Sequence, residues 1–122
     1  MADFATKLMC LFLILGLAAP SLATEYVIGG SAGWDLNVDL SLWLNGKIFK
    51  VGDVLVFNYD PKLHNLVRVD LVGFTTCLPL NILSIDTSGN TIITLDKPGV
   101  FYYISSLFTD CLSGLKIKIT VL

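Results

Sequence analysis

Few side chains in this sequence are of the types needed for chemistry. There is a single histidine, His64, and there are three cysteines, Cys10, Cys77 and Cys111. The acidic residues lie mainly at predicted turns, where Asp commonly caps or ends a segment. The chain contains no phosphate-binding glycine loop. We therefore expect that the protein is not an enzyme.

The first 23 residues have the layout of a secretory signal peptide. A weakly positive start with Lys7 precedes the apolar run of residues 8–19, and a proline and small residues ending at Ala23 follow. The apolar run of about 12 residues is shorter than the roughly 20 that a membrane span needs. We predict cleavage after Ala23, with residues 1–23 as signal peptide and residues 24–122 as one domain. A buried helix or an uncleaved anchor is the alternative.

Secretion sets the expected chemistry of the cysteines. Cys10 leaves with the signal peptide, so Cys77 and Cys111 remain as an even pair in a chain that passes through an oxidising compartment. We predict a disulfide between them, with two buried free thiols as the alternative. Such a bond closes a loop of roughly 35 residues and stabilises the fold by about 3–4 kcal/mol.

Charge argues against a nucleic-acid partner. The formal net charge is −2, and loss of Asp3 and Lys7 with the signal peptide leaves it unchanged. The remaining lysines are scattered, and nucleic-acid binding needs a dense positive stripe. There is also no Asn-x-Ser/Thr sequon, so N-glycosylation is not expected.

Strand patterns dominate residues 24–122. In the last segment, apolar Leu115, Ile117, Ile119 and Val121 alternate with polar residues, which predicts a half-exposed strand. Further strands are expected at residues 25–28, 47–51, 54–59, 64–70, 91–95 and 100–104. Residues 82–85 are too short a run to assign, and residues 73–79 are expected to be irregular. About seven short strands with regular turns favour an all-β sandwich or barrel.

One short helix is expected. It would span residues 39–46, with Asp39 as N-cap and Gly46 as its stop. Trp34 and Trp43 are interpreted as packing residues, although an exposed tryptophan could stack on a sugar. No helix is long enough for a βαβ unit.

Several stretches carry a more specific pattern. They are residues 26–30 with 33–34, 49–59, 64–65, 88–92, 98–99 and 102–104. Together they resemble the phytocyanins, the plant branch of the blue-copper (cupredoxin) proteins, and in particular an early nodulin-like type with a degenerate copper site. The resemblance covers essentially all of residues 24–122. It implies a cupredoxin-like, plastocyanin-like Greek-key β-sandwich of about seven strands in two sheets.

The resemblance also implies where copper would bind. In the family two histidines, a cysteine thiolate and an axial methionine or glutamine hold the metal. The first histidine corresponds to His64, and the family's Cys-x4-His-x4-Met/Gln loop corresponds to Ser105, Asp110 and Leu115. The cysteine after the second histidine position pairs in the family with one in the preceding irregular segment, which here are Cys111 and Cys77.

Three of the four ligand positions have therefore changed. The Ser105 hydroxyl stays protonated near neutral pH, Leu115 donates nothing, and the Asp110 carboxylate is a hard ligand that suits Cu(I) poorly. We expect no bound copper cofactor. His64 is then either an exposed remnant at the loop end or a weak Cu(II) or Zn(II) ligand together with Asp110.

The expected function follows from a retained fold beside a dismantled redox site. We expect a monomer, secreted to the extracellular space, the apoplast or the cell surface, with no membrane span after signal cleavage. It would bind an unknown extracellular partner, which could be a glycan, a cell-wall protein or a small molecule. The alternative is a copper-binding electron-transfer protein, as in the parent family. A third possibility is a duplicate that folds and is not used.

Overall fold

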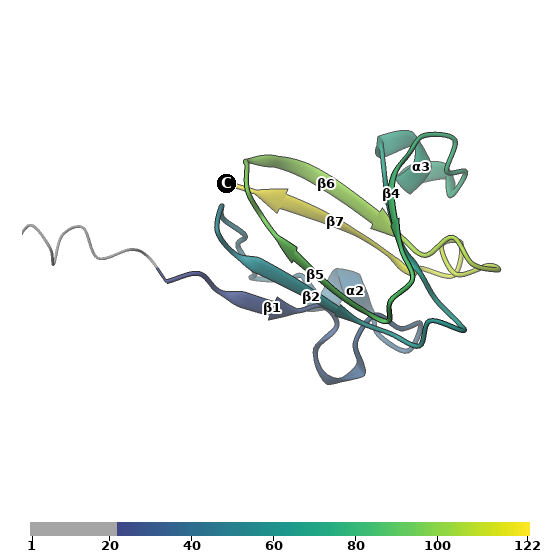
Figure 1. Ribbon diagram of the computed structural model, residues 1–122, viewed down its shortest axis with the longest axis horizontal. Helices are drawn as coiled ribbons and strands as arrows, with labels where there is room; N and C mark the ends of the chain where they lie inside the picture. Colours follow the sequence, from purple (N-terminus) through teal and green to yellow (C-terminus); the bar gives the residue numbers. More distant parts are fainter. Residues whose placement is uncertain (1–21) are drawn as a thin grey trace, which may run out of the picture.

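The computed structural model describes residues 22–122, which form two β-sheets facing each other (Figure 1). The three-stranded sheet has the order β1-β2-β5, built from Glu25–Val27, Val54–Asn58 and Asn90–Thr94. The four-stranded sheet has the order β4-β3-β6-β7, built from Ile82–Asp86, Leu66–Val69, Gly99–Ile104 and Lys116–Val121. Strands β1 and β2 pair in parallel and all other pairs are antiparallel. The prediction of seven strands in two sheets is confirmed.

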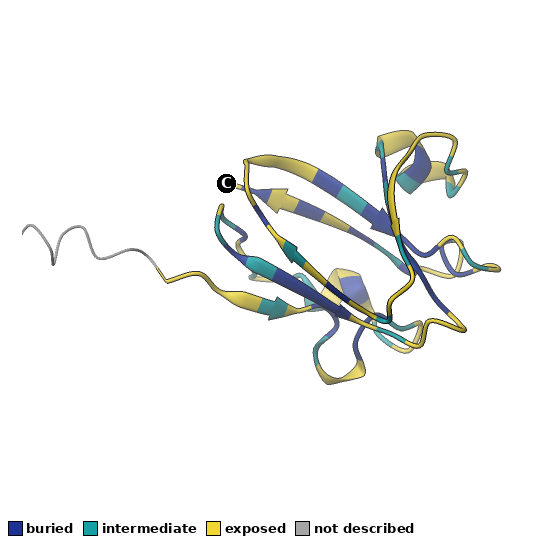
Figure 2. Ribbon diagram, in the orientation of Figure 1, coloured by how far each residue is buried: buried dark blue, intermediate teal, exposed yellow. Residues whose placement is uncertain are grey.

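Side chains from both sheets fill the space between them. Along β7 the exposure alternates residue by residue, and Leu115, Ile117, Ile119 and Val121 are all buried (Figure 2). The predicted half-exposed strand is therefore correct. Of the signal peptide predicted for residues 1–23, residues 1–21 lie outside the described part. Within residues 22–122, no helix has both the length and the apolar character for a membrane crossing.

Aromatic packing fixes the position of Trp34 in this core. Trp34 is fully buried and meets Phe57 edge to face at 5.3 Å, and Phe57 lies 5.4 Å from Tyr103 between ring centroids. Gly33 has φ 75°, and a Cβ on it would lie 2.5 Å from the carbonyl oxygen of Asn58. Only glycine allows this close approach, which lets the Trp34 N–H donate to that oxygen at 2.8 Å. The interpretation of Trp34 as a packing residue is confirmed.

The expected short helix is present and a second one was missed. Helix α2 spans Leu40–Trp43, and the Asp39 side chain accepts from the Leu42 N–H at 3.1 Å, as the sequence predicts. Helix α3 spans Leu71–Thr76, within and just before a segment that we expected to be irregular. Apart from Leu71, its residues are poor helix formers, so the helix depends on the Asp70 cap and on its tertiary contacts. A single 3-10 turn, η1, spans Gly30–Ala32.

The strand predicted for residues 47–51 was wrong. Phe49 forms only an isolated bridge with Val121. The Lys50 N–H is taken by the Asp53 side chain at 3.0 Å, and Lys50 accepts from the Asp53 N–H at 3.0 Å. These bonds curl the chain into a turn, so the apolar pattern of this segment reflects the burial of Phe49 and not a sheet position.

Candidate functional site

The turn that follows β2 positions the single histidine. Asp60 accepts from the Lys62 N–H through its side chain at 2.9 Å and from the His64 N–H through its carbonyl at 2.9 Å. This turn brings His64 over the end of the sandwich, just before β3 begins. His64 is 5% exposed, so the expectation of an exposed remnant was wrong. The missed cause is a partner 46 positions away in the sequence.

That partner is the carboxylate of Asp110. Its Oδ2 lies 2.7 Å from His64 Nδ1 and accepts from the Ser105 hydroxyl at 2.6 Å. Asp110 is 4% exposed and Ser105 is fully buried. Because an ionised carboxylate only accepts hydrogen bonds, we assign the proton of His64 to Nδ1. One buried carboxylate oxygen of Asp110 is therefore hydrogen-bonded to two other residues that correspond to copper ligands of the family, His64 and Ser105.

Asn65 forms further hydrogen bonds with the same cluster. Its N–H donates to Ser105 Oγ at 3.2 Å, and its side chain exchanges two hydrogen bonds with Ser106, at 2.8 and 2.9 Å. The Trp34 indole N–H donates to the Asn65 carbonyl at 2.9 Å. The hydroxyl of Ser105 therefore accepts from Asn65 and donates to Asp110, so that it is used both as acceptor and as donor.

Leu115 is joined to these residues by backbone hydrogen bonds, and its side chain takes no part. Its N–H donates to the Asp110 carbonyl at 2.9 Å, and its carbonyl accepts from the Ser105 N–H at 3.0 Å. The Leu115 side chain is fully buried in the main hydrophobic core. The structure thus gathers His64, Ser105, Asp110 and Leu115 at one end of the sandwich.

The donor atoms at this end do not suit a blue-copper site. They are an imidazole nitrogen, a carboxylate and a hydroxyl, and the fourth side chain is a hydrocarbon. A type 1 copper site needs a thiolate, and its weak axial ligand is a methionine or glutamine side chain. Among residues 22–122, no group of three or more His, Cys, Asp or Glu residues is arranged to hold a metal ion.

A shallow hollow opens next to His64. It has a volume of about 370 Å³ and is lined by Asp35, Leu36, Asn37, Leu63, His64, Phe108 and Asp110. Asp35 Oδ2 lies 3.8 Å from His64 Nε2, so the imidazole stands between two carboxylates. Phe108 also lines the hollow. It is 84% exposed and has φ 52°, an uncommon conformation for a bulky residue.

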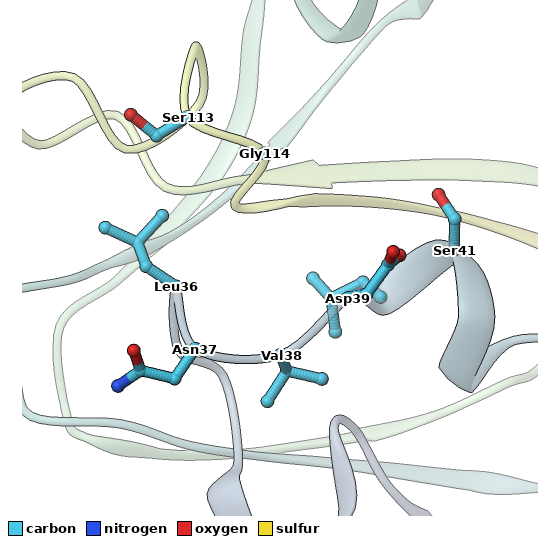
Figure 3. Close-up of a pocket in the computed structure, with 8 residues that line it drawn as sticks. Leu36, Asn37, Val38, Asp39, Ser41, Ser113 and Gly114 are labelled. Atoms are coloured by element: carbon cyan, nitrogen blue, oxygen red, sulfur yellow. The ribbon is translucent and has the colours of Figure 1, made fainter.

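A second hollow is lined in part by the same segment. Its volume is about 380 Å³, and it is lined by residues 36–41 together with Ser113 and Gly114 (Figure 3). Asn37, Asp39, Ser41 and Ser113 give it a polar lining, in contrast to the apolar first hollow. Leu36 and Asn37 line both.

Sequence reasoning missed three residues of this end. Asn65 stands beside His64 in the sequence, and its amide could have been considered as a partner. Phe108 is an isolated aromatic in a predicted loop, which is a weak signal of exposure. Asp35 has no local signal, because its proximity to His64 depends on the packing of distant segments.

The predicted disulfide is present directly next to the site. Cys77 and Cys111 are bonded, with 5.7 Å between their Cα atoms and a sequence separation of 34. Cys111 follows Asp110 in the loop, and Cys77 ends helix α3 with φ 58°. The bond therefore ties the loop of the candidate site to α3.

Comparison with known proteins agrees with the fold and gives the family. The plastocyanin-like domain family matches residues 34–115. The chain is 43% identical over 97 residues to the basic blue protein of Cucumis sativus, covering 80% of this chain and 98% of that protein. It is 38% identical over 120 residues to a blue copper protein of Pisum sativum, covering 97% of this chain and 64% of the relative. This chain thus spans slightly less than two thirds of the pea protein.

A solved structure supports the same conclusion. Cucumber basic protein, a blue copper protein, superimposes with a TM-score of 0.73 and 42% identity, covering 81% of this chain and 100% of that chain. The architecture is a cupredoxin-like β-sandwich, as the sequence predicts. The chain belongs to the phytocyanin family of plastocyanin-like domains. This is a family of blue copper proteins and not of enzymes, in line with the sequence expectation.

Proposed function

We propose that this chain is a secreted phytocyanin-like domain of the early nodulin-like type that binds an extracellular partner without redox copper. The observation that carries the proposal is the double hydrogen bond to Asp110. Its Oδ2 takes up both His64 Nδ1 and the Ser105 hydroxyl, at 2.7 and 2.6 Å. Three of the four residues that correspond to the family's copper ligands are therefore hydrogen-bonded to one another.

Metal binding would have to compete with this cluster. A metal ion at His64 Nδ1 needs the lone pair of that nitrogen, whereas in the structure Nδ1 faces the carboxylate of Asp110. The imidazole would have to give up a buried, charge-assisted hydrogen bond, which is among the stronger hydrogen bonds in proteins. Without a thiolate at position 105, little copper affinity compensates for that loss.

The surface around His64 supports a binding role. Phe108 is 84% exposed. Leu36 and Leu63, which line the same hollow, are also exposed, and so is Leu112 in the loop of Phe108. A bulky residue with positive φ is strained, and such strain is often retained at functional sites. An exposed aromatic beside an apolar hollow is also the usual form of a binding anchor.

Of the partner classes considered, a glycan suits this end best. A sugar ring has apolar C–H faces and a rim of hydroxyl groups. The apolar hollow with Phe108 could accept a ring face, and the polar hollow of Figure 3 offers Asn37, Asp39 and Ser113 to hydroxyls. Cell-wall proteins and small molecules are the other outcomes of the binding test.

A glycan array with the secreted protein tests the binding role. We expect retention of at least one wall glycan, and a loss of roughly tenfold or more in affinity for Phe108→Ser. Leu80→Ser is the matched control, because Leu80 is 87% exposed and precedes β4, outside the hollow. Blank arrays together with blank pull-downs from wall extract would contradict the proposal.

Copper titration tests the loss of the redox site. We expect the wild type to show no intense thiolate-to-copper absorption band and no tight Cu(II) binding by calorimetry. The triple variant S105C/D110H/L115M should acquire a blue band if the family positions are assigned correctly. A colourless triple variant would mean that the loop assignment is wrong.

The second candidate function is a copper-dependent electron carrier. It is favoured by the names of the relatives, several of which are blue copper proteins. A tight and redox-active copper site in the wild type would establish it and would remove the copper-free proposal.

A further inference from the structure

A buried carboxylate lies at the opposite end of β2 from His64. Asp53 is fully buried and immediately precedes β2. Its Oδ2 accepts from the Lys50 N–H at 3.0 Å, and its Oδ1 accepts from Lys50 Nζ at 3.1 Å and from the Thr24 backbone nitrogen at 2.9 Å. No role in the candidate site explains a charge buried here.

Thr24 is held at both of its backbone groups. Its nitrogen donates to Asp53, and its carbonyl accepts from the Val54 N–H at 2.9 Å, one residue before β1 begins. The residue before it, Ala23, is exposed, and Leu22 is 84% exposed. Within residues 22–122, Thr24 is thus the first residue whose backbone is hydrogen-bonded to the domain.

The charge balance at Asp53 favours a second cation. A fully buried carboxylate is costly unless it is paired and hydrogen-bonded. The one side-chain cation in contact among the described residues is Lys50, whose side chain is 40% exposed and therefore partly screened. The Thr24 nitrogen is closer to Oδ1 than Lys50 Nζ is, and as an amide it contributes only a neutral hydrogen bond.

We propose that processing between Ala23 and Thr24 creates an α-ammonium group that pairs with Asp53, so that the buried carboxylate is the receptor for the mature N-terminus. A peptidase hydrolyses the bond with one water molecule, which leaves a carboxylate on Ala23 of the leader and an α-ammonium on Thr24. The amide nitrogen at 2.9 Å then becomes a charged donor in the same place. The proposal rests on removal of the leader and is independent of copper and of any partner.

The groups around this pair are few. Lys50 contacts the same oxygen as the Thr24 nitrogen. Glu25 follows Thr24 and is exposed, and Asp96 follows Leu95, whose N–H donates to the Asp53 carbonyl at 2.8 Å. Burial alone would raise the pKa of the Asp53 carboxyl, and the hydrogen bonds from Thr24 and Lys50 outweigh it and lower that pKa.

The first experiment is mass spectrometry of the N-terminus after secretion of the full chain from plant cells. We expect a free amine on Thr24. A first residue other than Thr24 would overturn the proposal, because the Thr24 nitrogen would then remain an amide or be lost.

The second experiment is an NMR pH titration of the α-amino group in that secreted product. Pairing with Asp53 favours the charged amine, so its pKa should exceed the ordinary value of about 7.7–8.0 by roughly one unit or more. The shift should persist in Glu25→Gln and disappear in Asp53→Asn. An ordinary value in the folded wild type overturns the proposal, even if the Asp53 variant fails to fold.

A stability measurement gives the same test an independent readout. Because the amine pKa is raised in the folded state, its stabilisation is complete below pH 8 and is lost as pH rises through the folded value. The thermal midpoint of the secreted protein should therefore fall between about pH 8 and 10. Selective acetylation of the N-terminus should remove that fall. If the acetylated protein shows the same fall in thermal midpoint as the unmodified protein, the proposal is contradicted.

Discussion

At the scale of single residues, Asp110 connects two segments that lie far apart in the chain. It is one acceptor for two donors, His64 and Ser105, and none of the three is more than 5% exposed. Such a cluster is stable only when every member has its partner, because an unpaired polar group in a region of low dielectric constant is costly. The consequence can be measured by removing the shared acceptor.

Asp110→Ala should lower the free energy of unfolding by about 2–3 kcal/mol, because it leaves an imidazole N–H and a hydroxyl buried without an acceptor. Urea denaturation measures the change. Asp96→Ala is the control, since Asp96 is exposed, and it should change stability by less than about 0.5 kcal/mol. Equal effects of the two substitutions would show that the Asp110 cluster contributes nothing.

At the scale of elements, helix α3 shows how tertiary contacts override weak propensity. Gly73 is buried in it, and a Cβ there would lie 2.8 Å from the Val69 Cβ in β3. Phe74 packs against Tyr102 with 5.1 Å between ring centroids, and Lys116 Nζ donates to the Phe74 carbonyl at 2.8 Å. Close contact with the sheet, and not local sequence preference, therefore holds the helix.

Gly73→Ala should destabilise the protein by about 1–3 kcal/mol through this clash, although alanine is the better residue in an isolated helix. Combining it with Val69→Ala should cost less than the sum of the two single changes, because the smaller side chain makes room. Chemical denaturation of the four proteins in this cycle gives the coupling. Strict additivity would mean that the helix shifts freely and that the close approach is unimportant.

The disulfide connects the end of α3 to the loop of the candidate site. It closes a long loop, with a sequence separation of 34. The double variant C77S/C111S should lose about 2–5 kcal/mol, as is typical for small secreted domains. Thermal unfolding with and without reductant checks this, since reductant should lower the midpoint of the wild type and leave the variant unaffected. A variant as stable as the wild type would contradict the prediction.

At the scale of the whole molecule, two carboxylates near opposite ends of β2 set the response to acid. Burial works against ionisation of Asp53, but the hydrogen bonds from Thr24 and Lys50 lower its pKa overall. The hydroxyl and the N–H of Ser88 lower the pKa of Asp86, and Tyr59, just after β2, also donates to its carboxylate at 3.3 Å. Both groups therefore bind protons more readily in the unfolded chain.

Groups with lowered pKa values stabilise the fold above the unfolded value, near 3.9 for Asp, and this contribution is lost as pH falls through the folded values. The wild type should therefore lose stability more steeply between about pH 4 and 2 than the variant D53N/D86N. Urea midpoints across that range measure the two slopes. Parallel curves would show that neither carboxylate is coupled to folding.

The sequence by itself determined the features that depend on neighbouring residues. The period-two pattern of residues 115–121 was sufficient to predict β7 and its buried face, and Asp39 marked the start of α2. The resemblance to the phytocyanins implied the fold and placed His64, Ser105, Asp110 and Leu115 in one region. Two cysteines in a chain that was expected to be secreted were enough to predict their bond. These features follow from local backbone geometry, from composition and from the resemblance to a known family.

Only the tertiary structure decided how distant polar groups are satisfied. In the structure His64 is buried against Asp110. Residues 47–51 do not form a strand, because the Lys50 N–H donates to the Asp53 side chain. The tertiary structure also folded residues 71–76 into a helix against β3 and brought Thr24 to a buried carboxylate. A buried hydrogen-bonding group needs a partner wherever the fold can supply one, and that choice depends on contacts between segments that the sequence order does not reveal.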